Sequence, residues 1–466
     1  MDQENQNSPK KENPENQPAQ ETIEFDAGEV NRLNEQPEEF DLTDFSEGLF
    51  EEPENPDDPA DPPEDPLENA EELPDLFPDM EDPPVPEEPF FEGEPTIVPR
   101  PERKKKSTGR KVALVFRSIF KWLIALVLAV AILAAGLIGY LTVAEYHPAY
   151  SEETRHGGWD LAKPYKGEEI SLLTFNTGHG GLGQDADSFW EGGETVTAET
   201  PEEVFRNMEG IAKILGRSKA DFLFLQEVDL DSRRSFEENQ WIRYEQSLQG
   251  YESRFALDDS CKFVPYPIKD VLGKIHSGIA TYSRYEIGAS TRYSLPNPLP
   301  WPERILERKP CFTLTRIPTG TQEENKPELV LLNLHLEDCE DDEARRAQME
   351  AILTIMQEEY DKGNYVIAGG DFDQTFPGAR EYPLRSQDTV RPNVLDRLGG
   401  GWRYVFDDSV PTCRLADQPY DPYTAQCFVT DGFIVSPNVQ VLSVETLDEG
   451  FTYSSHNPVL LRVQLT

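Results

Sequence analysis

Two carboxylates lie at the end of one apolar stretch, residues 365–373. The run from Tyr365 to Ala368 suits a buried strand, and two glycines then precede Asp371 and Asp373. Side chains two positions apart on extended backbone point to the same side, so a metal ion or a water could sit between these acids. Taken alone, the stretch has an alternative interpretation, an Asx-rich turn in which each Asp only bonds its own backbone.

Similar polar side chains lie at the borders of other strand-like stretches, far away along the chain. They are Asn176, Glu227, Asn333, His335, Asp431 and His456. Any one of them could be a solvated end residue or a satisfied core histidine. Their recurrence in a chain with only six histidines favours one shared cleft, in which oxygen ligands hold a cation and histidines move protons. For His179, in a glycine-rich loop, a solvated side chain is the favoured interpretation.

The elements that carry these residues alternate between strand and helix. The continuous apolar run 220–227 is typical of a strand covered on both faces. Before it, Thr200 fits a helix N-cap and Pro201 the first turn, and an apolar face follows, formed by Val204, Met208, Ile211 and Leu215. A second helix is predicted for 342–360, with core-facing Ala344, Ala347, Ala351 and Ile355. The order strand, helix, strand indicates an α/β fold.

Composition divides the 466 residues into unequal parts. Residues 1–100 carry 33 of the 88 acids but only four basic residues, and they contain nearly half of the 39 prolines. Such a segment cannot bury a core, so we predict an acidic, Pro-rich disordered tail whose partner is unknown. Short apolar islands in it are more readily explained as sporadic residues than as docking motifs.

A basic juxtamembrane segment, residues 101–121, precedes the uncharged stretch 122–144. About 23 residues at about 1.5 Å each can cross a hydrocarbon core about 30 Å thick, which predicts one transmembrane helix. A signal peptide is disfavoured because such segments lie at the extreme N-terminus. The positive-inside rule predicts a single-pass protein of the cell membrane, with a cytoplasmic N-terminus and the domain 147–466 outside.

The five cysteines are few, odd in number and widely spaced, without a CxxC pair that could hold zinc. They indicate no disulfide framework. One bridge, between Cys413 and Cys427 across a short loop, is left open by the sequence.

In order, the motifs from about residue 170 to the C-terminus resemble those of the endonuclease/exonuclease/phosphatase superfamily. They are Leu-Thr-Phe-Asn176, Leu-Gln-Glu227, Ser277-Gly278 to Arg284, Asn333-Leu-His335, Gly-Gly-Asp371-Phe-Asp373, Asp431-Gly-Phe-Ile and Ser455-His456-Asn-Pro. The chain is identified as a bacterial-type member by this resemblance, which implies a four-layer α-β-β-α sandwich, and the apolar segment predicts that it is membrane-anchored. The family includes nucleases, sphingomyelinases and inositol polyphosphate phosphatases. The tail and the apolar helix lie outside the resemblance.

The resemblance also implies roles for individual residues. Glu227 would bind Mg²⁺ or Mn²⁺ with the help of Asn176, and Asp371 would orient or deprotonate the attacking water. His456, held by Asp431, would stabilise the phosphorus centre or move a proton. His335 would bind a phosphate oxygen or assist the leaving group, and Asn333 on the same strand face would contact substrate.

Two positions depart from the family's pattern: Asp373 stands where the family usually has Asn, and Ser455 where it usually has Asp. A second acid at 373 could repel an anionic transition state and slow the reaction. Alternatively, Asp373 supplies the metal carboxylate that is missing at 455.

The charge of the C-terminal domain bears on its substrate. It carries 53 acids against 31 basic residues, the wrong sign for the capture of nucleic acid, which therefore becomes a less favoured substrate. A metal-dependent phosphodiesterase or phosphatase that acts on phospholipid head groups or small phosphoesters fits better. The alternative is a catalytically weakened binding or scaffolding ectodomain.

Overall fold

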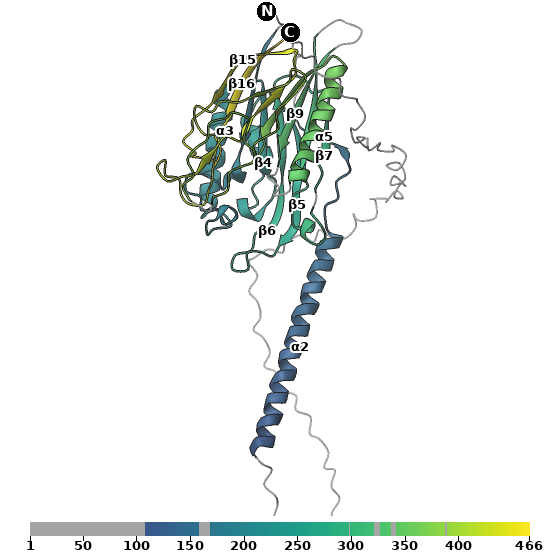
Figure 1. Cartoon of the computed structure of the whole chain (residues 1–466), viewed down its shortest axis with the longest axis vertical. Coiled ribbons are helices and arrows are strands. Elements are labelled where there is room, and N and C mark those ends of the chain that lie inside the picture. Colours follow the sequence, from purple (N-terminus) through teal and green to yellow (C-terminus); the bar gives the residue numbers. More distant parts are fainter. Residues whose placement is uncertain (1–107, 158–167, 298, 321–326, 337–341, 387–388) are drawn as a thin grey trace, which may run out of the picture. The chain divides into compact units, whose positions relative to one another are not determined.

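A computed structural model describes residues 108–157, 168–297, 299–320, 327–336, 342–386 and 389–466. The predicted tail, 1–100, and part of the basic segment lie outside the described residues. The fold itself is the predicted one, an α/β sandwich with two large sheets (Figure 1).

Each sheet contains seven strands. In spatial order, the first sheet consists of β1 (Ser151–Glu153), β7 (Ala289–Ser294), β8 (Cys311–Pro318), β9 (Glu328–His335), β10 (Tyr365–Asp371), β14 (Asp431–Val435) and β11 (Arg403–Val405). The second consists of β15 (Val439–Thr446), β16 (Val459–Leu465), β3 (Glu169–Asn176), β4 (Phe222–Asp229), β6 (Gly273–Ser283), β5 (Glu252–Val264) and β2 (Arg155–Gly157). Strands β12 (Cys413–Arg414) and β13 (Cys427–Phe428) form a separate pair.

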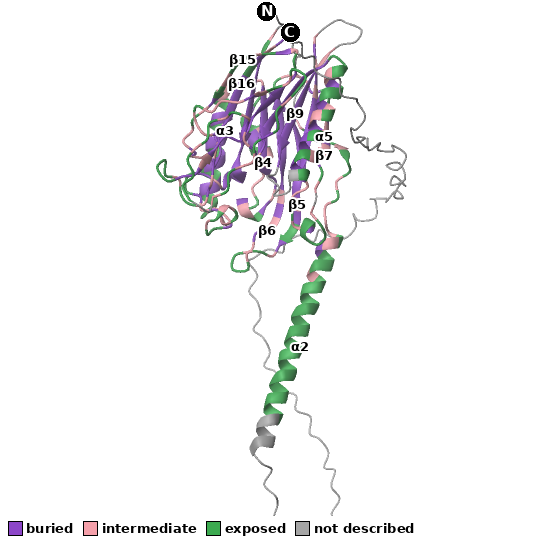
Figure 2. Ribbon diagram, in the orientation of Figure 1, coloured by how far each residue is buried: buried purple, intermediate pink, exposed green. Residues whose placement is uncertain are grey.

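Three apolar cores separate the four layers. Alternate residues of β3 and β4, such as Leu172 and Phe224, pack against Leu331 and Phe433 of the first sheet. The other faces of the two sheets are covered by α3 (Pro201–Ser218) with α4 (Gln240–Ser247), and by α5 (Asp342–Asp361). The central strands are therefore buried on both faces, as Figure 2 shows, which explains their continuous apolar runs.

Helix α3 begins as predicted. Thr200 is the N-cap, and its hydroxyl accepts a hydrogen bond from the backbone N–H of Glu203. The predicted apolar face, from Val204 to Leu215, is buried in the core beneath the second sheet.

The predicted core face of α5 is right at Ala344, which is buried, and is displaced by a small rotation of the helix at the other three positions. Ala347, Ala351 and Ile355 are only half-buried, whereas Ile352 and Met356 are fully buried. The buried face also carries polar side chains with partners: Glu359 pairs with Arg316, and Gln348 bonds to a backbone carbonyl. Glutamate and glutamine are ordinarily exposed, so the sequence alone did not place Gln348 and Glu359 on the buried face.

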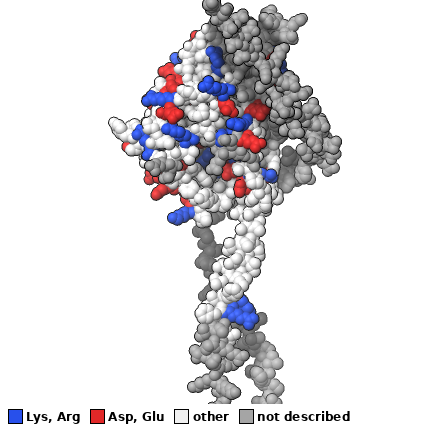
Figure 3. All heavy atoms as spheres, viewed as in Figure 1, with Lys and Arg blue, Asp and Glu red and all other residues white. Residues whose placement is uncertain are grey.

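Helix α2 (Thr108–Val143) contains a stretch, Leu114–Val143, whose length and apolar composition suffice to cross a membrane. From residue 122 onward its surface carries no charged side chain (Figure 3). The predicted segment 122–144 thus falls within this helix, except for its last residue.

The bridge left open between Cys413 and Cys427 is not formed, and both are free thiols. Cys413 lies directly opposite Phe428 in the β12–β13 pair, and Arg414 lies opposite Cys427. Because directly opposite residues share a face and successive residues alternate, the two thiols fall on opposite faces of the pair.

Candidate active site

Strand borders from both sheets meet at one edge of the sandwich. Asn176 ends β3 and Glu227 lies near the end of β4, while His335 and Asp371 end the parallel neighbours β9 and β10. In register, Asp371 lies beside His335 on one side and beside Asp431 of β14 on the other. Strand pairing therefore fixes three of the predicted residues next to one another.

One oxygen, Asp371 Oδ2, is the centre of this group. Asn176 Nδ2 donates to it at 3.0 Å and to Glu227 Oε1 at 3.1 Å, which links the two sheets. His456 Nε2 lies 3.6 Å away and His335 Nε2 3.8 Å away. The oxygen of the Asn176 amide accepts from the N–H of Gly178, so in this arrangement Asn176 turns its nitrogen toward the carboxylates.

Glu227 is presented by an irregularity in β4. The register between β4 and β6 shifts between Leu225 and Val228, and Glu227 has a left-handed φ of 52°. Its Oε2 lies 3.0 Å from Nδ1 of His179. Burial alone would raise the pKa of Glu227, but the hydrogen bond from His179 and nearby positive charges hold it well below the ordinary value. Glu227 is therefore ionised at neutral pH.

His456 and Asp431 form a buried pair, with His456 Nδ1 2.9 Å from Asp431 Oδ2. Burial would lower the pKa of His456, but Cys413, Asp431 and Asp371 together raise it well above the ordinary value. Burial raises the pKa of the Cys413 thiol to about 12, so that thiol is neutral and the two carboxylates supply the favourable charge. We infer that His456 is cationic at neutral pH.

His335 has the opposite protonation state. Its ring is buried, and Arg308 Nη1 lies 2.8 Å from Nδ1 and 2.9 Å from Nε2. Burial and the Arg308 charge lower the pKa of His335 to about 3. The ring is therefore neutral, and it faces a fixed cation.

A cavity of about 170 Å³ opens beside Glu227 and His335. Its wall includes Arg308 and two buried acids of β5, Asp258 and Asp259. Burial raises the pKa of both acids, and that of Asp259 to about 7. The cavity is thus lined by charges of both signs.

In the wall of this cavity, Arg234 forms two hydrogen bonds with Asp229, of 3.1 and 2.9 Å. The pair is nearly enclosed, since the Asp229 side chain is fully buried. The Arg234 guanidinium, whose side chain is 16% exposed, supplies positive charge near Glu227.

Among the described residues, one group of acids and histidines is compact enough to hold a metal ion. Asp371, Asp431 and His456 each offer a ligand atom, and these atoms lie within 4.8 Å of one another. The buried Oδ1 of Asp431 has no hydrogen-bond partner, which fits a site for a cation. The two carboxylates offer the oxygen ligands that a hard divalent ion such as Mg²⁺ or Mn²⁺ prefers, whereas His456 could ligate only after losing a proton.

Three residues singled out from the sequence are placed away from this group or differently from expectation. Asn333 is fully buried between the sheets, where its amide bonds to Gln226 and to the Ala280 carbonyl. Asp373 has a left-handed φ of 51°, and its backbone N–H donates to Asp371 Oδ1. Ser455 is buried beside His456. Neither Asn333 nor Asp373 belongs to the compact group.

Several residues of the site were missed or misjudged from the sequence. His179 is buried against Glu227 rather than solvated, because a short 3-10 turn (Gly178–Gly180) folds it inward with φ 42°. Arg308 lies in a coil segment and Arg234 in a short turn, where an arginine is ordinarily solvated. The only signal in the sequence was the glycine-rich setting of His179.

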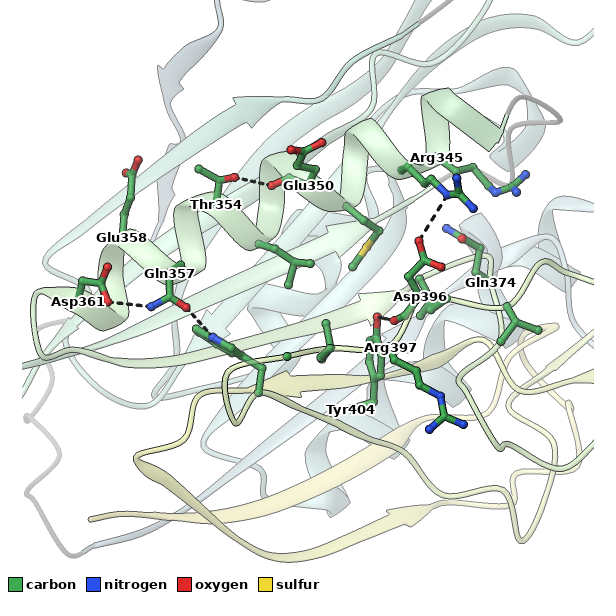
Figure 4. Close-up of a pocket in the computed structure, with 18 residues that line it drawn as sticks. Arg345, Glu350, Thr354, Gln357, Glu358, Asp361, Gln374, Asp396, Arg397 and Tyr404 are labelled. Carbon is green, nitrogen blue, oxygen red and sulfur yellow. Dashed lines mark hydrogen bonds and ion pairs between the residues drawn. The ribbon is translucent and has the colours of Figure 1, made fainter. Parts of the chain in front are cut away.

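A larger groove, of about 710 Å³, lies between α5 and residues 394–404 (Figure 4). It is lined by polar and apolar side chains, with Asp396 paired to Arg346 at 3.4 Å across it. None of the residues of the active-site edge lines it, so its size does not make it the catalytic site.

Comparisons with known proteins bear on the fold and the family. The sequence model of the Endonuclease/Exonuclease/phosphatase family matches residues 173–456. No curated protein matches this chain. A solved endonuclease/exonuclease/phosphatase from Beutenbergia cavernae DSM 12333 is 14% identical with a TM-score of 0.45, over 64% of this chain and 72% of that one.

Two further solved structures are similarly distant. ANGEL2, a 2',3'-cyclic phosphatase, is 14% identical with a TM-score of 0.42, over 67% of this chain and 98% of that one. TDP2 from Caenorhabditis elegans is 15% identical with a TM-score of 0.38, over 64% and 75%. None of these likenesses assigns a substrate to this chain.

Proposed function

This chain belongs to the endonuclease/exonuclease/phosphatase family, and we propose that it is a membrane-anchored, divalent-metal-dependent hydrolase of phosphate mono- or diesters. The observation that carries the proposal is the convergence on Asp371 Oδ2 of Asn176, His335 and His456, with Glu227 alongside. Acids and histidines that cluster at the edge of the sandwich can activate a water molecule for attack on phosphorus.

Asp371 would orient and deprotonate the attacking water. Its Oδ2 is the shared neighbour of two imidazoles and one amide, and its Oδ1 is held by the N–H of Asp373. Because both carboxylate oxygens are held in place, Asp371 can bind the attacking water in only one orientation. Positioning of this kind removes much of the entropic cost of the reaction.

His456 would stabilise negative charge on the phosphoryl group and deliver a proton to the leaving oxygen. Asp431 holds its Nδ1, so Nε2 is directed toward the centre of the site. His335 is a poor proton donor because its ring is neutral and faces Arg308. We therefore assign His335 and Arg308 to phosphate binding.

A divalent ion would neutralise charge on the phosphoryl oxygens. Ionised Glu227 and, after rotation of its amide, Asn176 would hold it, as the family implies, and the nearby carboxylates Asp371 and Asp431 would add oxygen ligands. Cationic His456 has no free lone pair for a metal and would act as the proton donor. Asp373 remains our proposed substitute for the acid absent at position 455.

The test uses the full chain, purified in detergent, with bis(p-nitrophenyl) phosphate and p-nitrophenyl phosphate as substrates. Hydrolysis should require Mg²⁺ or Mn²⁺ and be abolished by chelator. Asp371→Asn should lower kcat by about 10²–10⁴-fold, the usual contribution of general base catalysis. The matched control is Asp396→Asn, since Asp396 is a 79% exposed acid in the remote groove.

The outcome also decides the second candidate function. If wild-type protein hydrolyses neither ester faster than Asp371→Asn, the catalytic proposal fails. A binding or scaffolding ectodomain would then be the better account, and Asp373 and Ser455 are the two observations that favour it.

A further inference from the structure

Exposed apolar side chains lie on Trp190, which lines the active-site cavity, and on the β5–β6 connection, whose Tyr266 contacts Trp190. We call Trp190, Phe263, Tyr266 and Ile268 the aromatic rim; they are 52, 37, 51 and 87% exposed. Trp190 and Tyr266 are in ring contact, and Phe263 and Ile268 lie within three residues of Tyr266; a group of exposed apolar side chains marks a candidate interaction site.

The rim is continuous with the catalytic cavity. Trp190 lines the cavity that contains Glu227 and His335. Its ring lies 6.0 Å from that of Tyr266, and Phe189 packs against both rings at 5.4 and 5.5 Å. A surface or molecule that binds the aromatic rim therefore also lies next to the entrance of the active-site cavity.

A chain of contacts connects the rim with the end of the apolar helix. Beneath the rim, Val264 and Leu272 form a small core against which Leu306 packs. Leu306 belongs to the segment 301–309, which also contains Trp301. The Nε1 of Trp301 donates a hydrogen bond of 3.2 Å to Thr142, at the end of α2. The same segment carries Arg304 and Lys309, each 3.3 Å from the buried Glu145 just after α2.

The chemistry of the rim suits the surface of a bilayer. Trp and Tyr side chains favour the membrane–water interface, where one part of the ring is apolar and the other wet. Exposed Lys262 and Lys269 flank the apolar residues, in a domain that is acidic as a whole. Basic residues near a membrane are attracted to anionic lipids.

We propose that the aromatic rim contacts the membrane in which α2 is anchored, and that the substrate is a phosphoester carried by a lipid of that membrane. This inference rests on the proposed hydrolase function and narrows its substrate class. Lateral diffusion of a lipid along the surface would bring its head group past Trp190 to Asp371 without a step through solution.

Membrane contact is tested without any assay of activity. The full chain is reconstituted in vesicles of phosphatidylcholine and phosphatidylglycerol, with brominated phosphatidylcholine as a quencher of tryptophan fluorescence. Subtracting the fluorescence of Trp190→Phe from that of wild type gives the contribution of Trp190, which should be quenched by the brominated lipid. The contribution of Trp402, obtained in the same way from Trp402→Phe, should not be quenched, since Trp402 lies in the remote groove. If the fluorescence assigned to Trp190 is not quenched, the proposed contact is wrong.

The substrate class is tested in the same vesicles by comparing release of phosphate ester from phosphatidylglycerol with hydrolysis of bis(p-nitrophenyl) phosphate. Tyr266→Ser and Ile268→Asp should lower lipid hydrolysis by about tenfold or more and leave the soluble ester unaffected. Tyr423→Ser and Val390→Asp are the matched controls, since both residues are over four-fifths exposed and lie outside the rim.

The outcomes separate this inference from the proposed function. If the rim variants lose hydrolysis of both substrates, or keep hydrolysis of both, the proposal of a lipid substrate is wrong. If wild type hydrolyses neither substrate, the proposed function fails, while the quenching result still decides whether the rim touches the membrane. Concentration-dependent self-association without quenching would assign the rim to a second copy of the chain instead.

Discussion

Two histidines within 4 Å of the same carboxylate oxygen have opposite protonation states. His456 lies beside two carboxylates, which favour its cationic form. His335 faces the Arg308 guanidinium, which favours its neutral form. The difference arises from neighbours, because both rings are buried. Environments that push the pKa values of paired groups apart in this way divide acid and base roles within one site.

The neutral state of His335 predicts a dependence of stability on pH. The unfolded chain takes up a proton at this position below about pH 6.5, whereas the folded protein does so only near its pKa of about 3. Stability contributed by the neutral ring is therefore present above pH 6.5 and lost as pH falls toward 3. Lowering the pH from about 7.5 to about 5 should cost wild type about 2 kcal/mol through this residue.

Urea unfolding of metal-free protein at these two pH values measures the effect. His335→Gln, which cannot titrate, should lose about 2 kcal/mol less than wild type over the interval. His456→Gln is the control, since loss of a histidine whose pKa is raised changes the dependence in the opposite direction. Equal losses for wild type and His335→Gln would contradict the neutral assignment.

The sequence identified residues at strand ends better than residues in coil. Asn176, Glu227, His335 and Asp371 were found because buried strands are readable as apolar runs, and polar residues at their ends must meet at a sheet edge. The role of Arg308 depends on the path of a coil, and that of His179 on a left-handed turn. Neither follows from local periodicity, so both could be recognised only in the folded chain.

Irregular strands position the acids of the site. The register shift in β4 lies at Gln226 and Glu227, and that in β5 lies at Asp258, between Leu257 and Asp259. A bulge redirects a side chain that regular alternation would point elsewhere. This explains why neighbouring Asp258 and Asp259 both line the cavity, which strict alternation along the sequence would not predict.

The rotation of α5 predicts a difference between two isoleucines of the same helix. Ile352 is fully buried and Ile355 is half-buried. Ile352→Ala should cost about 2–5 kcal/mol through lost burial and a cavity. Ile355→Ala should cost less than half as much.

Urea titration of the two variants beside wild type measures both values. The pair is matched in chemistry and in helix propensity, so only burial differs. A larger cost at Ile355 would support the helix face predicted from the alanines rather than the observed one.

At the scale of the whole chain, charge and hydropathy predicted the organisation without any tertiary information. The acidic tail, the basic segment 101–121 and the apolar stretch follow one another, and each is defined by composition alone. The sandwich fold was predicted through ordered motifs and is confirmed by the two packed sheets. The membrane orientation that we predicted for α2 rests on flanking charge rather than on packing, so the fold does not test it.

Those flanking charges can be tested directly through the topology of the chain. Eight Lys and Arg residues lie between residues 103 and 121, and none follows between residue 122 and Tyr150. On intact cells that express the full chain with a tag at each end, antibody should reach the C-terminal tag, and the N-terminal tag only after permeabilisation. Replacing Arg103, Lys104, Lys105 and Lys106 by Gln should lower the fraction with this orientation, because retention of basic residues in the cytoplasm sets it.

The matched control replaces Lys10, Lys11 and Arg32, which lie far from the helix, and should change nothing. An N-terminal tag accessible on intact wild-type cells would overturn the assigned orientation, and an unchanged distribution in the Gln variant would remove the basic segment as its cause.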